Sequence, residues 1–227
     1  MDKVQTESTP VPVIAAISRV VTRVADRITG DRSDYPLLVA LGVYEGLKIL
    51  GVQSRILYGS ACWLEVADDH SLIWAGAWDG LLHFWLETEF GEKVDLNLSV
   101  AHRKPFSNEF KQKPLYSPPM LWSNEIPGFC KYQPIGVAEF DEPESERDRK
   151  WLNTLREELG KNLTEGTLTA SDPDFANEPI LCSGRSLLDD SFETFKNYDR
   201  ALGVLGIPES PFDIDSVSTT PSPETRV

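Results

Sequence analysis

The chain has 227 residues, 41% of them apolar, and its 36 acidic against 22 basic side chains give a net charge of −14. This length and apolar content are those of a globular protein with one sizeable hydrophobic core. The acidic balance argues against nonspecific binding to nucleic acid or to an anionic membrane, because the average field repels phosphate groups.

The three cysteines, Cys62, Cys130 and Cys182, are widely spaced and form no CxxC motif. This spacing predicts neither a zinc site nor a disulfide framework, and the sequence indicates no metal and no cofactor. The first residues lack the basic and then apolar layout of a signal peptide, and no apolar run is long enough to span a membrane. A cytoplasmic location is therefore expected.

The beginning of the chain is predicted to be helical. Residues 1–12 contain two prolines and are expected to form a flexible arm. Over residues 13–29 the apolar side chains recur at helical intervals, which predicts an amphipathic helix. Gly30 is a natural end for this helix, and Pro36 fits the first turn of the next one.

The second predicted helix, residues 36–50, is apolar nearly all round, which indicates a helix buried in the core. Gly42 and Gly46 lie one turn apart on it and would let another element pack closely against it. In the polar loop before this helix, Ser33 or Asp34 is a candidate to cap the free N–H groups of the first turn.

After this helix the apolar period changes to that of β-structure. Strands are predicted over residues 54–58, 61–66, 83–87 and 94–98, with a bend or bulge at Gly59. Helices followed by an antiparallel meander predict the α+β class, in which the N-terminal helices pack on an antiparallel sheet.

The second half of the chain is less regular. Residues 101–132 are rich in proline and aromatic side chains, which predicts an ordered loop packed on the sheet, before a last strand near residues 135–140. The α+β domain is expected to span residues 13–140. Residues 141–207 are predicted to form a helical C-terminal extension, with a narrow apolar stripe of Trp151, Leu152, Leu155 and Leu159 on its first helix. Residues 208–227 are predicted to form a disordered tail.

The predicted hairpin over residues 83–98 carries the chemistry that the sequence shows most clearly. His83 and Trp85 share one face of the first strand, and a turn at residues 91–93 brings the chain back. Asp95 then lies beside His83. A carboxylate on one ring nitrogen fixes the tautomer of an imidazole and raises the basicity of the other nitrogen, which is the orienting half of a nucleophile–His–Asp triad.

These features together resemble the transglutaminase-like branch of the papain-like cysteine hydrolase fold, whose core arylamine N-acetyltransferases share. The resemblance covers about residues 30–100. It rests on the buried helix ending in Leu50-Gly51-Val52, on the His-x-Trp-x-Glu pattern of residues 83–87, and on Asp95 in the next strand. It implies a cysteine at the start of the buried helix, facing His83, where the helix dipole and the imidazole create a thiolate nucleophile.

The chain departs from this family at the nucleophile, because no cysteine precedes Cys62. Ser33 stands near the matching place. It is either a hydroxyl nucleophile, the position of a substituted cysteine, or only a helix cap. Cys62 lies in the middle of an apolar strand, where a thiol usually packs as a small hydrophobic group.

Three tryptophans are candidates for contact with a ligand. Trp63, Trp78 and Trp85 fill the core or line a groove for a peptide or a small molecule. The missing cysteine favours a catalytically silent domain that binds a peptide or protein partner. The alternative is a hydrolase or acyl transferase that uses His83 and Asp95 with a nucleophile at position 33. Self-association through the same aromatics is a third reading.

Overall fold

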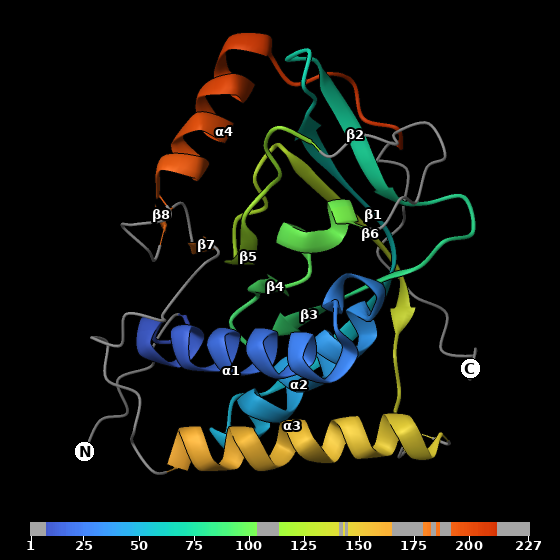
Figure 1. The fold of residues 1–227 in the computed structure, drawn as a ribbon, viewed down its shortest axis with the longest axis vertical. Coiled ribbons are helices and arrows are strands. Elements are labelled where there is room, and N and C mark those ends of the chain that lie inside the picture. The colour runs from blue at the N-terminus through green and yellow to red at the C-terminus, as the bar shows by residue number, and fades with distance from the viewer. Residues whose placement is uncertain are drawn as a thin grey trace.

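The protein was analysed as a computed structural model, which describes residues 8–103, 114–140, 143, 145–164, 179–182, 185–186 and 192–212. Among these residues, an eight-stranded mixed sheet is combined with four α-helices and two short 3-10 helices. The predicted α+β class is therefore confirmed. In Figure 1 the sheet occupies the middle, with α1, α2 and α3 below it and α4 above.

Three helices cover one face of the sheet. They are α1 (Val11–Thr29), α2 (Pro36–Ile49) and α3 (Glu146–Thr164), and their apolar stripes share one core cluster with Ile56, Leu86, Val94 and Trp122 of the strands. The charged helix predicted after residue 140 is thus part of the main core, because Leu152, Leu155 and Leu159 are buried in it.

The strand β1 (Ser54–Val66) is the centre of the sheet. Along one edge it pairs first with β3 (His83–Thr88) and then with β2 (Leu72–Ala77), and along the other edge with β6 (Cys130–Val137), all antiparallel. Two strands were predicted here. The structure has one, with a register shift at the predicted bend, where a Cβ on Gly59 would lie 2.2 Å from the Gln133 carbonyl oxygen.

The sheet continues from β3 through four short strands. They are β4 (Lys93–Asp95), β5 (Met120–Ser123), β7 (Ile180–Cys182) and β8 (Arg185–Ser186), and only the β5–β7 pair is parallel. The strand β4 is shorter than predicted, since the chain turns into the 3-10 helix η2 (Leu98–Arg103). The strands β5 and β6 begin within the segment predicted to be a loop, of which residues 104–113 lie outside the described part.

The other face of the sheet holds a second core cluster, which is rich in aromatic side chains. Helix α4 (Phe192–Leu205) covers it with Tyr198 and Leu202, and the Tyr198 hydroxyl donates to the Leu64 carbonyl oxygen at 2.9 Å. Both faces of the sheet are therefore buried. Helices α3 and α4 of the predicted extension complete the two core clusters, and of the predicted tail only residues 208–212 are described.

The N-terminal arm is held against the sheet from Thr9 onward. Thr9 is buried, and its N–H and hydroxyl donate to the Glu92 carboxylate at 2.9 and 2.5 Å. The same carboxylate accepts from the Thr88 hydroxyl at 2.9 Å and from Trp122 Nε1 at 3.3 Å. Of the arm predicted to be flexible, Thr9 is thus held in place, α1 starts at Val11, and residues 1–7 lie outside the described part.

The close approach predicted for the buried helix is present between α1 and α2. A Cβ on Gly42 would lie 3.0 Å from a Val21 methyl, and one on Gly46 would lie 3.1 Å from Ile17. Gly46→Leu should therefore lower the free energy of unfolding by about 1–3 kcal/mol, measured by urea denaturation. Gly160→Leu on α3 is the matched control, because a Cβ there meets nothing within 4 Å. Equal effects of the two substitutions would show that the helices do not pack so closely.

Candidate functional site

His83 and Asp95 form a buried pair on neighbouring strands. His83 begins β3 and Asp95 ends β4, and both side chains point into the second core cluster, on the same face of the sheet as Trp85. His83 Nε2 donates to Asp95 Oδ2 at 2.7 Å, and the two residues are 1% and 2% exposed. The hairpin thus brings these two predicted site residues together.

The Asp95 carboxylate is satisfied by two further donors. The Tyr132 hydroxyl donates to Oδ2 at 3.0 Å, and the Asn97 backbone N–H donates to Oδ1 at 3.1 Å. Burial raises the pKa of Tyr132 well above its usual value, and the nearby Asp95 charge raises it further. The phenol therefore stays protonated and remains a hydrogen-bond donor to the carboxylate.

Aromatic rings enclose the imidazole. The His83 ring centroid lies 5.7 Å from that of Trp63 and 6.4 Å from that of Trp85, whose ring is nearly parallel to it. The Trp85 ring in turn contacts Tyr132, with 5.0 Å between centroids. Trp63 and Trp85 are fully buried, so the structure places them in the core. Trp78 follows the end of β2 and is half-buried.

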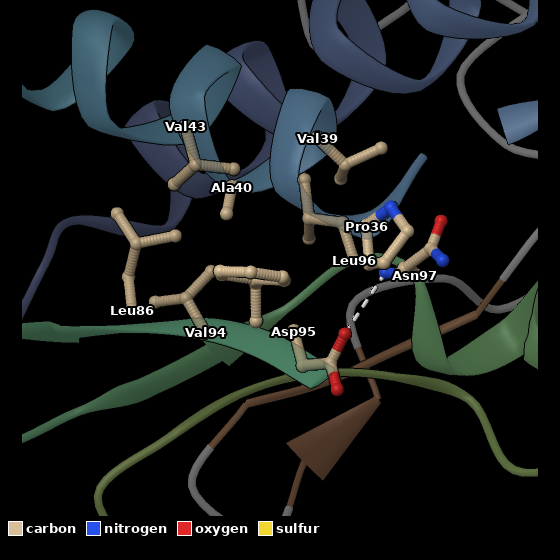
Figure 2. A pocket seen from close by; sticks show the side chains of 10 residues that line it. Pro36, Val39, Ala40, Val43, Leu86, Val94, Asp95, Leu96 and Asn97 are labelled. Atoms are coloured by element: carbon tan, nitrogen blue, oxygen red, sulfur yellow. Dashed lines mark hydrogen bonds between the residues drawn. The ribbon is translucent and has the colours of Figure 1, made fainter. Parts of the chain in front are cut away.

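The pair does not face the buried helix, contrary to the expectation from the resemblance. Helix α2 packs on the face of the sheet that carries Leu86 and Val94, whereas His83 and Asp95 point to the opposite face. Figure 2 shows the narrow apolar pocket between α2 and these strands, with Val94 directed toward the helix and the Asp95 carboxylate turned away from it. The dipole of α2 is therefore not aimed at the imidazole.

Ser33 lies in the 3-10 helix η1 (Arg32–Asp34) and is buried. Its prediction as a helix cap is wrong, because the N-cap of α2 is Tyr35, which makes no side-chain capping bond. Burial alone would raise the pKa of Asp31, but the N–H and hydroxyl of Ser33 and the Arg103 charge lower it. The Ser33 hydroxyl is thus engaged with Asp31. Its carbonyl accepts from Asn97 Nδ2 at 3.3 Å, so Ser33 reaches the pair only through Asn97.

The cysteines are poor candidates for a nucleophile. Burial raises the pKa of Cys62 and of Cys182 to about 12, and it raises that of Cys130 well above its usual value. The Asp95 charge raises the Cys130 pKa further, so this thiol lies within electrostatic reach of the pair. All three cysteines are free thiols that remain protonated at neutral pH.

Cys130 and Tyr132 are members of the cluster that sequence reasoning missed. They alternate on β6, which is the period of a strand that turns both side chains to one face. Glycine and prolines around them indicated a loop instead. No set of three or more His, Cys, Asp or Glu residues in the described part could hold a metal ion. In the same residues, no helix is both long and apolar enough to cross a bilayer.

Comparison with known proteins leaves the chain without an assigned family. No protein-family model and no curated protein matches it. Among solved structures, the crystal structure of a structural-genomics target, APC5867, is similar to it with a TM-score of 0.44 and 11% sequence identity. The alignment covers 79% of this chain and 98% of that one. This similarity is too low to establish a shared fold or function.

Proposed function

We propose that this protein is a catalytically silent, transglutaminase-like α+β domain that acts as a peptide- or protein-binding module. The observation that carries the proposal is the environment of the His83 imidazole. The ring is buried among aromatic side chains, its Nε2 is committed to Asp95, and the pair points away from the start of α2. A general base must come within hydrogen-bond reach of the group that it deprotonates, and this ring is shielded from substrate.

The pair has a structural role in this proposal. It ties β3 to β4, and through the Tyr132 hydroxyl it ties both strands to β6. Buried polar groups of this kind are retained when all partners are satisfied, because an unpaired member would be costly. The free cysteines suit a reducing compartment, which supports our proposal of a cytoplasmic location.

Exposed apolar side chains support a binding role. Ile135 and Val137 of β6 are 59% and 41% exposed. Within the described part of the chain, β6 pairs along one edge only, so its other edge offers free backbone groups. Such edges bind extended peptides by strand addition, and a surface with exposed aliphatic side chains adds apolar contact.

Active-site labelling tests the catalytic silence. We expect fluorophosphonate and iodoacetamide probes to leave the folded protein essentially unlabelled, because no described hydroxyl or thiol is both accessible and activated. Urea-unfolded protein, in which the three thiols react with iodoacetamide, is the positive control. Stoichiometric labelling of one residue beside His83 in the folded protein would overturn the proposal.

The alternative function is a hydrolase or acyl transferase that uses His83, Asp95 and Ser33. The connection from Ser33 through Asn97 to Asp95 is the observation in its favour. It requires the Ser33 hydroxyl to leave Asp31 and the imidazole to turn toward α2. Under this alternative, Ser33→Ala removes labelling by a fluorophosphonate, whereas under the proposed function there is no such labelling to remove.

A further inference from the structure

The segment that follows α4 crosses back over the sheet. Gly206, with φ of 74°, ends the helix in a left-handed conformation, and its N–H donates to the Leu202 carbonyl oxygen at 3.0 Å. From there the chain runs from the end of α4 across to β2 (Figure 1). We call residues 207–212, with the sequence Ile-Pro-Glu-Ser-Pro-Phe, the strap.

The strap makes three contacts, with β1, with β2 and with the turn before β6. The Pro208 carbonyl oxygen accepts from Trp74 Nε1 at 3.3 Å. Ile207 lies over Gly128, where an added Cβ would come within 2.8 Å of its Cδ1 atom. The Ser210 side chain hydrogen-bonds the Cys62 thiol. We call the residues that receive the strap, Cys62, Trp74 and Gly128, the strap surface.

The composition of the strap makes it an extended, easily displaced segment. Its two prolines fix φ and lack an N–H, and the residue before each of them is biased toward extended backbone. The strap has no strand pairing, and Ile207 remains 52% exposed. In this contact an indole N–H on an aromatic surface donates to the carbonyl of a proline. Proline-containing peptides are recognised by such aromatic surfaces.

We propose that the strap is an internal ligand and that the strap surface is the docking site for an external peptide of the same chemistry. The partner is an extended peptide with two prolines and apolar ends, which competes with the strap for Trp74 and Gly128. Lys131 pairs with Cys62 across β1 and β6, and its charge suits an acidic residue between the prolines, as Glu209 is in the strap. This inference rests on the proposed binding function and adds to it a second docking surface besides the edge of β6, the peptide class and an autoinhibitory contact.

The rate at which the Cys62 thiol is labelled measures whether the strap covers it. In the full-length chain, Ile207→Asp places a charge against Gly128 and should loosen the strap without touching either core cluster. We expect iodoacetamide to label Cys62 about tenfold faster in this variant than in the wild type, as read by mass spectrometry of peptides. Cys182 on β7 is buried in the first core cluster, away from the strap, so its labelling rate should not change.

Ser210→Ala is a second variant that leaves Ile207 in place and removes the hydroxyl on Cys62. It should also accelerate Cys62 labelling, to a lesser extent. Equal Cys62 rates in the wild type and both variants would overturn the proposal. Equal acceleration of Cys62 and Cys182 would overturn it as well, because that result reports general opening of the fold and not release of the strap.

Peptide binding tests the partner. A fluorescent synthetic peptide of residues 206–212 should bind full-length Ile207→Asp about tenfold more tightly than wild type in an anisotropy titration, because the strap no longer competes. Trp74→Phe in the Ile207→Asp background keeps a ring and removes the indole donor, and should weaken binding about threefold to tenfold. A peptide with both prolines replaced by alanine is the matched ligand control.

Equal binding of the peptide to wild type and Ile207→Asp, or binding to neither, would contradict the proposal. These outcomes are separate from a failure of the proposed function. Labelling beside His83 would refute catalytic silence, whereas labelling of Cys62 and peptide affinity concern only the strap surface.

Discussion

Asp95→Ala is expected to lower the free energy of unfolding by about 3–5 kcal/mol, since removal of one member of a buried pair leaves the other without a partner. Three donors lose their acceptor at once: His83 Nε2, the Tyr132 hydroxyl and the Asn97 N–H. Urea denaturation followed by tryptophan fluorescence and circular dichroism measures the loss. Much of the chain should remain folded at low temperature, because both apolar clusters are otherwise intact.

Two controls separate the pair from general damage to the core. Tyr132→Phe removes only the hydroxyl and should cost about 1.5–3 kcal/mol, the contribution of a hydrogen bond to a charged group. The double substitution His83→Phe with Asp95→Leu replaces the pair by apolar side chains and should recover about 2 kcal/mol of the loss seen with Asp95→Ala. A loss below about 1 kcal/mol for Asp95→Ala would mean that the carboxylate is solvated and that the buried pair does not exist as described.

Glu92→Ala should have an effect of similar size, about 3–4 kcal/mol. The Glu92 carboxylate is 1% exposed and accepts from the N–H and hydroxyl of Thr9, the hydroxyl of Thr88 and the indole of Trp122. Its loss leaves these donors buried without an acceptor and frees the N-terminal arm. We expect a lower urea midpoint, and proteolysis should remove the arm from the variant before it cleaves the rest of the chain.

Thr9→Val is the matched control on the other side of the contact. It keeps the shape and the backbone N–H and removes the hydroxyl, so it should cost about 1.5–3 kcal/mol, the contribution of a hydrogen bond to a charged group. Wild-type stability in both variants would show that the arm is not held by Glu92.

The hairpin of residues 83–98 was predictable because its strands and its turn are determined by residues that are close together in the sequence. The period of two places His83 and Trp85 on one face, and the turn at residues 91–93 sets the register that brings Asp95 beside the imidazole. The face to which they point was not predictable. Phe84 and Leu86, on the other face of β3, are also apolar, because both faces of this sheet are covered. The alternation of side chains therefore does not show which face meets α2.

Other elements depend on contacts between distant residues. Gly59 predicted a break, but the long strand β1 continues through it because the β6 backbone approaches closely there. Tyr132 joins the Asp95 carboxylate from the segment of residues 101–132, whose prolines argued against a strand. Glu92 sits in a turn, where a charged residue is normally solvated, and only the arrival of Thr9 from 83 positions away buries it.

The apolar stripes of the C-terminal helices were read correctly, while their place in the molecule was not. Leu152, Leu155 and Leu159 were predicted to form one narrow face of a helix in an extension. In the structure they complete the cluster formed by α1 and α2. An apolar stripe shows that one face of a helix is buried, but it does not show against which surface of the protein that face packs.

Hydrogen–deuterium exchange at the Cε1 position of the histidine rings, read by mass spectrometry, tests the central claim most directly. The claim is that the His83 imidazole is sealed in the aromatic cluster and is not available to a substrate. His70, in an exposed turn of the same chain, is the internal reference. We predict that His83 exchanges at least about tenfold more slowly than His70, because exchange of a buried group requires local opening. Exchange of His83 as fast as that of His70 would contradict the account.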